Sequence, residues 1–252
     1  MNQTGKGVLL VTGASRGIGA ATAVLASARG YAVGINYRHD AQAAEAVVRQ
    51  IEQGGGTAMA IQADVAHEQD VIGMFDACTH QFGQITGLVN NAGILECQST
   101  LATMQIDRIR RVFETNVFGT ILCAREAVRR MAISAGGAGG GIVNVSSAAA
   151  RLGSPGEYVD YAASKGAIES LTIGLAREVA AEGIRVNAIR PGFIETDIHA
   201  SGGEPDRINR VKAGIPLQRG GRPEEVAEAI LWLLSPKSSY TTGSFIDVSG
   251  GK

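Results

Sequence analysis

Short apolar runs alternate with longer segments of helical periodicity along the chain. The apolar runs predict strands at residues 8–11, 32–35, 58–61, 85–89, 142–145, 186–189 and 244–248. The periodic segments predict helices at residues 17–29, 41–53, 67–82, 103–133, 158–181 and 223–234. Repeated strand–helix–strand units with nearly continuous apolar strands are typical of a parallel sheet covered on both faces. Since no change of composition marks a second domain, residues 1–252 are expected to form one doubly wound α/β domain with a seven-stranded parallel sheet and helices on both faces.

Three groups of glycines need to be separated by what precedes and follows them. The runs at 54–56 and 136–141 follow predicted helices and precede strands, so they are helix stops and connections. Gly13, Gly17 and Gly19 lie instead between the first strand and the first helix, where backbone N–H groups point at an anion. Their spacing is Gly-x-x-x-Gly-x-Gly and not the dinucleotide fingerprint Gly-x-Gly-x-x-Gly. On this pattern alone, a phosphate-binding turn and an ordinary tight turn are both open.

Tyr161 and Lys165 are four residues apart in a segment that predicts a helix. At this spacing the two side chains share one helix face, with Cβ atoms roughly 5–6 Å apart. Tyrosine is a poor acid or base near neutral pH because its pKa is about 10, but a nearby ammonium favours the phenolate. We therefore expect Lys165 to lower the pKa of Tyr161 by one to a few units, which suits proton transfer to a carbonyl or from an alcohol.

These two residues belong to a longer series of motifs. In chain order the series is the glycine turn at 12–19, Asn90-Asn-Ala-Gly93, Asn116, Ser147, Tyr161, Lys165 and Pro191-Gly192. In order and spacing it closely resembles the short-chain dehydrogenase/reductase family, from Val8 to Gly251. The resemblance implies a Rossmann domain that transfers hydride between a nicotinamide cofactor and a carbonyl, secondary alcohol or sugar.

The resemblance also implies roles for four residues around the reacting carbon. Tyr161 would exchange the proton, and Ser147 would hydrogen-bond the same oxygen. Lys165 would hold the nicotinamide ribose, and Asn116, inside the long fourth helix, would position a water that links Lys165 to solvent. Side chains alternate across a strand, so only one of Ser146 and Ser147 can face the cleft, and the strand-end pattern of the family selects Ser147.

Two further observations concern the catalytic tyrosine. Tyr158 is a decoy, because the residue four positions after it is Ala162 and no ammonium would face it. Ser147 and Tyr161 are 14 positions apart, one more than is usual in the family, which we interpret as an insertion within residues 153–160.

The same resemblance implies an extended cofactor site. It places Asp64 and Val65 at the adenine, Asn90 and Gly93 on the adenosine side, and residues 191–196 against the nicotinamide half. The complete expected set is Gly13, Ser15, Arg16, Gly17, Ile18, Gly19, Tyr37, Arg38, Asp64, Val65, Asn90, Ala92, Gly93, Tyr161, Lys165, Pro191, Gly192, Ile194 and Thr196.

The end of the second strand indicates which nucleotide is bound. NAD-specific sites commonly carry a carboxylate there, whereas this strand ends Asn36-Tyr37-Arg38. Arg38 and Arg16 could grip a 2′-phosphate through charge-assisted bonds, which favours NADP(H). Alternatively, Arg38 covers surface or pairs with Asp40, and NAD(H) binds instead.

Residues 193–218 are rich in turn-forming residues, and the family resemblance makes them a mobile lid over the substrate. The sequence resembles both 3-oxoacyl-thioester reductases and glucose 1-dehydrogenase-like members. Glu182 and the neutral stretch 134–141 argue against docking of a carrier protein, so a sugar, a polyol or a small ketone is open. The alternative from another class is a non-catalytic nucleotide-binding sensor or scaffold on the same fold.

Composition excludes several classes of function. The formal charge of −1 gives no basic surface for nucleic acid or an anionic membrane. The N-terminus lacks a signal-peptide pattern, and no apolar run approaches the ~20 residues of a membrane span. The three cysteines are expected to be buried, reduced thiols, and the four scattered histidines predict no metal site. We expect a cytoplasmic homotetramer formed through the long fourth helix and residues 158–181, or else a dimer.

Overall fold

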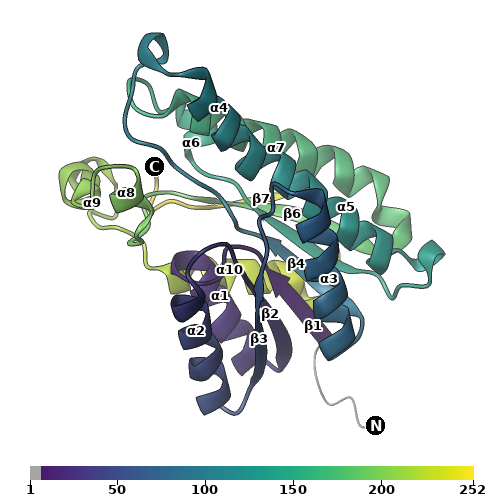
Figure 1. Ribbon diagram of the computed structural model, residues 1–252. Coiled ribbons are helices and arrows are strands. Elements are labelled where there is room, and N and C mark those ends of the chain that lie inside the picture. The colour runs from purple at the N-terminus through teal and green to yellow at the C-terminus, as the bar shows by residue number, and fades with distance from the viewer. Residues whose placement is uncertain (1–6) are drawn as a thin grey trace.

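The computed structural model describes residues 7–252 and contains one parallel sheet of seven strands. The strand order is β3-β2-β1-β4-β5-β6-β7 (Figure 1). The strands are β1 Gly7–Val11, β2 Tyr31–Tyr37, β3 Thr57–Gln62, β4 Ile85–Asn90, β5 Gly140–Val145, β6 Ile184–Pro191 and β7 Phe245–Val248. The predicted parallel sheet and its seven strands are therefore confirmed, within two residues at each end.

Helices cover both faces of the sheet, as the sequence predicts (Figure 1). One face packs against α1 (Gly17–Ala28), α2 (Ala41–Gln53) and α10 (Pro223–Leu234). The other packs against α3 (Glu68–Phe82), α5 (Gly119–Met131) and α7 (Val159–Glu178). Local signals set two of the helix starts. The Asp40 side chain accepts from Ala43 N at 2.9 Å, and Pro223 opens α10.

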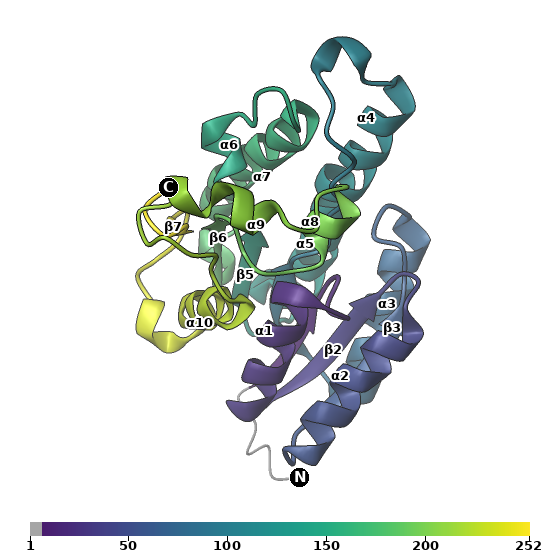
Figure 2. The ribbon, with the colours of Figure 1, turned by 90° about the vertical axis from the view of Figure 1, so that its left-hand side faces the viewer.

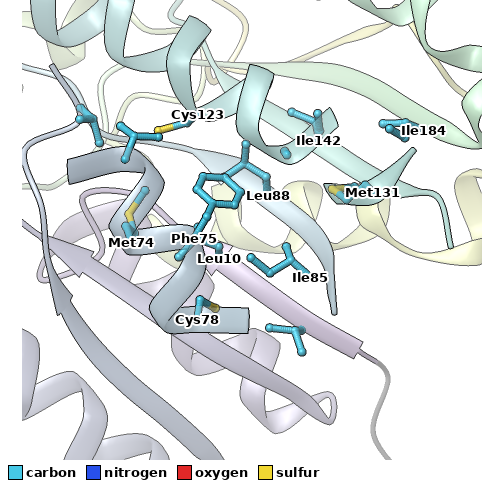
Figure 3. Packing of buried hydrophobic residues seen from close by; sticks show 14 of the residues in the cluster. Leu10, Met74, Phe75, Cys78, Ile85, Leu88, Cys123, Met131, Ile142 and Ile184 are labelled. Atoms are coloured by element: carbon cyan, nitrogen blue, oxygen red, sulfur yellow. The ribbon is translucent and has the colours of Figure 1, made fainter. Parts of the chain in front are cut away.

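Two apolar clusters, one on each side of the sheet, form the core. Along β1, Leu9 and Val11 belong to the cluster beneath α1, α2 and α10, whereas Val8 and Leu10 belong to the other. This alternation explains why β1 is apolar at every position. Figure 3 shows the second cluster, with Phe75 of α3 among side chains from the strands and α5.

The cysteines only partly follow the expectation. Cys78 and Cys123 are buried in the same cluster, and burial raises the pKa of the Cys78 thiol to about 12 (Figure 3). Cys97 is exposed, so the expectation that all three are buried is wrong at this residue. Cys97 belongs to the long connection after β4, and a scan for apolar periodicity does not place connections.

The predicted helix 103–133 is the largest departure in secondary structure. Helical structure runs from α4 (Ile106–Phe113) through a π-helical turn, Glu114–Phe118, into α5. A short 3₁₀ turn, Leu101–Thr103, precedes α4. One-turn π segments within α-helices are frequent at functional sites, and this one contains Asn116.

The strand order reverses between β1 and β4, at the point where ligands bind in open α/β sheets. The remaining short helices lie toward the carboxyl ends of the strands: α6 (Ala149–Leu152), α8 (Ile198–Ser201) and α9 (Arg207–Val211). Figure 2 looks onto this end of the molecule, with α8 and α9 in front. Within residues 7–252, none of the helices has the length and apolar character needed to cross a lipid bilayer.

Candidate active site

A cavity of about 590 Å³ lies at the carboxyl ends of the strands. Its wall combines the glycine-rich turn after β1, the ends of β2, β4, β5 and β6, the first turns of α7, and the segment carrying α8. Segments far apart in the sequence therefore meet where the strand order reverses, which suits an elongated ligand that touches many short segments.

The glycine turn has the geometry of an anion cradle. Gly13 and Gly17 adopt φ of +60° and +56°, a left-handed conformation that favours glycine. A Cβ on Gly13 would lie 2.9 Å from Ala92 Cα, so a side chain there would collide with backbone. No side chain caps the start of α1, which leaves its first N–H groups free for a ligand. These features fit the pyrophosphate of a dinucleotide.

Two asparagines that the sequence analysis did not single out hold this turn. Asn91 Nδ2 donates to Thr12 O and Gly13 O, both at 2.9 Å. Asn36, buried at the end of β2, accepts from Gly13 N at 3.1 Å through Oδ1. The available signal for Asn36 was a polar residue within an otherwise apolar strand. Asn36 supports the turn and also lines the cavity, directly before the two residues predicted to select the nucleotide.

Those positions are occupied by Tyr37 and Arg38, which line the cavity together with Arg16. Arg38 pairs with Asp64, with Nε and Oδ2 at 2.9 Å, and half of its side chain is exposed. The alternative partner considered from the sequence, Asp40, caps α2 instead. Arg38 thus lies at the rim of the cavity with part of its guanidinium accessible.

Most residues of the expected cofactor set line the cavity. These are Gly13, Ser15, Arg16, Gly17, Ile18, Tyr37, Arg38, Asp64, Val65, Ala92, Gly93, Tyr161, Lys165, Pro191, Gly192, Ile194 and Thr196. Gly19 and Asn90 lie behind the wall. A Cβ on Gly19 would lie 2.6 Å from Gly13 O, and the Asn90 side chain donates to Asn144 Oδ1 at 2.9 Å within the core. They shape the site from the second layer of residues.

Ser147, which follows β5, lines the cavity together with Tyr161 and Lys165 of α7. The Ser147 hydroxyl lies close enough to Tyr161 to favour its phenolate form. Lys165 is buried, and its Nζ donates to Val145 O at 2.8 Å and lies 5.5 Å from the centre of the Tyr161 ring. Ser146 is buried and donates to Lys165 O at 3.3 Å and Glu169 Oε1 at 3.1 Å, whereas Ser147 is the serine that acts on the pKa of Tyr161.

The pKa of the tyrosine departs from the expectation. Burial raises the pKa of Tyr161 to about 12, although the nearby Ser147 hydroxyl acts in the opposite direction. Burial also lowers the pKa of Lys165 to about 8. The predicted lowering of the Tyr161 pKa by Lys165 is therefore wrong for this structure. The charged forms of both residues lose solvation in the cavity, and this loss is the largest cause of each shift.

Asn116 does not line the cavity, but it connects two of its walls. Its Oδ1 accepts from Ile94 N at 2.8 Å, and its Nδ2 donates to Ile94 O at 3.1 Å and to Ser164 Oγ at 3.1 Å. The π-helical turn directs this side chain between the connection after β4 and α7. Thr120 Oγ1 donates to Asn116 O at 2.8 Å, which gives the backbone carbonyl in the turn a partner.

The segment expected to be a lid closes one side of the cavity. Tyr158 is buried, and its hydroxyl donates to Gly202 O at 3.3 Å, so this tyrosine contacts the lid. Arg207 lies over the Tyr158 ring, with Cζ 4.7 Å from its centre, and pairs with Glu157. The lid is thus attached to the segment that leads into α7.

His199 and Arg207 are buried lid residues on the cavity wall that the sequence analysis missed. His199 Nε2 lies 2.9 Å from Ile194 O, whereas its Nδ1 has no hydrogen-bond partner. Burial, helped by the positive charge of Arg207, lowers the pKa of His199. A lone histidine in a turn-rich segment shows no pattern from which its burial could be predicted. Its place on the cavity wall is apparent only in the fold.

The base of the lid contacts the C-terminal end of the chain. Leu217 N donates to Gly250 O at 3.1 Å, and Lys252 Nζ donates to Gly214 O at 3.1 Å. These bonds join the end of the lid to the turn that follows β7.

The described part of the chain contains no grouping of three or more His, Cys, Asp or Glu side chains that could hold a metal ion.

Comparisons with known proteins agree with this geometry. A family model described as enoyl-(acyl carrier protein) reductase matches residues 13–252. An uncharacterized oxidoreductase of Escherichia coli, YgfF, is 60% identical over 97% of this chain and 99% of its own length. A 3-oxoacyl-[acyl-carrier-protein] reductase of Synechocystis is 40% identical over 97% of this chain and 96% of its own.

Solved structures give the same result. A short-chain dehydrogenase/reductase from Mycobacterium marinum has a TM-score of 0.92 and 37% identity, covering 98% of this chain and 95% of its own. A Brucella melitensis 3-ketoacyl-(acyl-carrier-protein) reductase complexed with NADH and a Burkholderia cenocepacia short chain dehydrogenase in complex with NADP both have TM-scores of 0.90 and 33% identity. They cover 98% and 99% of this chain, and the same shares of their own chains. With its glycine turn, its Ser147–Tyr161–Lys165 cluster and these relatives, the chain belongs to the short-chain dehydrogenase/reductase family of NAD(P)-dependent oxidoreductases.

Proposed function

We propose that this protein is an NADP(H)-preferring dehydrogenase/reductase that interconverts a carbonyl and a secondary alcohol or sugar, with Tyr161 as its acid and base. One observation carries the proposal. Ser147, Tyr161 and Lys165 lie in the same cavity as an uncapped glycine-rich helix start. A sensor or scaffold would not need a serine and a tyrosine on the wall of the nucleotide cavity beside a buried lysine.

The proposed roles follow from these positions. Tyr161 gives its proton to the carbonyl oxygen in reduction and takes it back in oxidation, and Ser147 donates to the same oxygen as charge develops. Lys165 holds ribose hydroxyls of the cofactor, and Asn116 orders a water on the path to solvent. The bound nicotinamide supplies or takes up the hydride. The glycine turn holds the pyrophosphate, and residues 193–218 exclude water from the reaction as a lid.

The substrate class is best tested by turnover. Apolar side chains, among them Leu95, Leu152 and Phe193, line the cavity together with His199 and Arg207, which suits a substrate with both apolar and polar parts. Glu182 accepts from Ser134 N at 2.9 Å and adds negative charge where a carrier protein would require basic residues. We would screen ketones, aldoses, polyols and 3-oxoacyl thioesters with NADPH, NADP⁺, NADH and NAD⁺. Nucleotide binding without turnover of any of these would favour the sensor.

The nucleotide preference can be measured directly. We expect NADPH to bind roughly ten- to a hundred-fold more tightly than NADH, because charge-assisted bonds to the 2′-phosphate contribute about 1.5–3 kcal/mol each before solvent screening. Arg38→Ala should reduce this preference, mainly by weakening NADPH binding. Tyr37→Asp should turn it toward NADH by adding the missing carboxylate. Fluorescence titration of both nucleotides measures the ratio, with the exposed Arg49→Ala of α2 as the control. Equal affinities in the parent protein would contradict the proposed NADP(H) preference.

We also propose that the protein is a homotetramer, with a dimer as the alternative. Support comes from exposed apolar residues on the layer that contains α4, α5 and α7: Ile106, Phe118, Ile121 and Ile173 (Figure 1). Light scattering should give four times the chain mass of 26.1 kDa, and Phe118→Glu with Ile121→Glu should lower it. Leu101→Glu, at an exposed apolar residue outside these helices, should leave the mass unchanged. A monomeric mass for the parent protein would refute the assembly.

The unpaired thiols are typical of a reducing compartment, so the proposed location is cytoplasmic.

A further inference from the structure

A buried ion pair joins α4 to the first turn of α7. Arg108 Nε lies 2.8 Å from Asp160 Oδ2, and Nη2 lies 3.2 Å from Oδ1, so the pairing is bidentate. The two side chains are only 10% and 2% exposed. A buried ion pair adds little net stability over an apolar pair of the same size, because both charges lose their solvation. The pair therefore contributes little to the free energy of unfolding, and its main effect is on the positions of the segments that it connects.

On one side, the pair holds the residue proposed to be catalytic. Asp160 Oδ1 accepts from the backbone N–H of Tyr161 at 2.9 Å. The first N–H groups of a helix have no partner within the helix, and a carboxylate there also interacts favourably with the helix dipole. Asp160 thus fixes the turn that carries Tyr161, and Arg108 fixes Asp160.

On the other side, the pair holds the cavity wall that faces α7. Arg108 Nη1 donates to Cys97 O, in the connection after β4. Ile94 and Leu95 of the same connection line the cavity. Ser99 N donates to Glu157 O at 3.0 Å, so this connection is bonded to the segment before α7 as well. In Figure 1, α4 and α7 lie side by side, and the guanidinium bonds to both α7 and this wall.

We propose that Arg108 and Asp160 are positioning residues, which set Tyr161 against Ser147 and against the Ile94–Leu95 wall. This inference rests on the proposed function, since it assigns a purpose only if Tyr161 transfers the proton. Neither residue lines the cavity, so both act through Tyr161 and through the backbone at Cys97. Removing either partner should therefore impair the chemical step more than cofactor binding.

The pair also carries two opposite charges beside Tyr161. Removing one charge or the other should shift the pH midpoint in opposite directions, which a loss of packing would not do. Lys165 lies near the Tyr161 ring on the same helix, and the cavity wall on the α7 and lid side also contains the titratable side chains of Tyr158, Asp197, His199 and Arg207. Arg108→Met leaves the carboxylate of Asp160 unbalanced, which disfavours the phenolate and should move the pH midpoint of alcohol oxidation upward. Asp160→Asn leaves the guanidinium unbalanced and should move the midpoint downward, while its amide oxygen can still accept from Tyr161 N.

The experiment measures kcat, KM and the pH midpoint for these two variants and for the double variant Arg108→Met/Asp160→Asn. We expect kcat to fall about 10- to 100-fold in the single variants, as displacement of reacting groups typically does, with NADPH affinity unchanged. The double variant should return the midpoint toward that of the parent but retain a low kcat. Parent-like kcat with unmoved midpoints, or midpoints moved in the same direction, would overturn the inference. If Arg108→Met does not fold, Asp160→Asn decides alone, and an unmoved midpoint in it would overturn the proposal.

The same helix offers a matched control. Arg110 and Asp107 of α4 form an ion pair at 3.4 Å that is 66% and 75% exposed, so Arg110→Met/Asp107→Asn should match the parent in every measurement. Tyr161→Phe is assayed in parallel to separate the two proposals. If that variant keeps its turnover, the proposed function fails. If it is inactive while the pair variants behave like the parent, only the positioning inference fails.

Discussion

Replacing Tyr161 by phenylalanine should lower kcat about 10²- to 10⁴-fold, which is the range that a well-placed acid or base contributes. The change removes only the hydroxyl, so the ring continues to fill the same part of the cavity. NADPH affinity should remain close to that of the parent, because Lys165 and the glycine turn are untouched. Steady-state kinetics and fluorescence titration on the same preparation measure both quantities.

Tyr158→Phe is the control for this prediction. The Tyr158 hydroxyl donates to Gly202 O in the lid, and its ring lies under Arg207. Loss of the hydroxyl should leave the chemical step intact and affect substrate binding at most, through a looser lid. Turnover by Tyr161→Phe within a few-fold of the parent would remove Tyr161 from the mechanism, and inactivity of Tyr158→Phe would show that the two tyrosines had been assigned the wrong way round.

Lys165→Met should stabilise the fold while it removes activity. Burial lowers the pKa of Lys165 from 10.5 to about 8, and at about 1.4 kcal/mol per unit this corresponds to a penalty on the order of 3 kcal/mol for the charged form. Loss of the ammonium's bond to Val145 O offsets about 1.5–3 kcal/mol of this gain, so the net stabilisation is small. The net effect should appear as a rise in Tm of about 2–4 °C per kcal/mol for a chain of this size. NADPH binding should weaken and turnover should fall, since the ribose loses its proposed partner.

The pH dependence of this effect has a definite sign. The unfolded chain holds the Lys165 proton more tightly than the folded protein, so the destabilisation is complete below about pH 8 and disappears as pH rises toward 10.5. The Tm difference between Lys165→Met and the parent should therefore be largest at neutral pH and shrink between these limits. The exposed Lys237→Met serves as the control. A variant that is less stable than the parent at pH 7 would show that the bond to Val145 O outweighs the cost of burying the charge.

The strands were predictable because every strand of a covered parallel sheet is apolar on both faces. Leu9, Leu10 and Val11 are fully buried, and their run of apolar letters is the direct result. The π-helical turn at Glu114–Phe118 was not predictable, since the apolar period of a helix hardly changes when one turn is widened. Its cause is tertiary, in the bonds that hold Asn116 between Ile94 and Ser164.

In the candidate site, too, the local patterns were predictable from the sequence and the contacts between distant residues were not. The glycine turn and the Tyr161–Lys165 spacing are local patterns, so the sequence alone places them on their elements. The Arg108–Asp160 pair joins residues 52 positions apart, and no periodicity connects them. The predicted lowering of the Tyr161 pKa was wrong for a related reason. Helical spacing indicates that an ammonium is near, but it does not indicate how much solvation both groups lose inside the cavity.

The turn after β7 supports the segment proposed to be the lid. Gly250 and Lys252 bond to Leu217 and Gly214, so a substitution that moves this turn also moves the base of that segment. β1 begins at Gly7, at the end of the sheet away from this segment (Figure 1). Residues far from the reacting groups in sequence can therefore alter access to the cavity, and the turn after β7 is the place where such distant effects are expected.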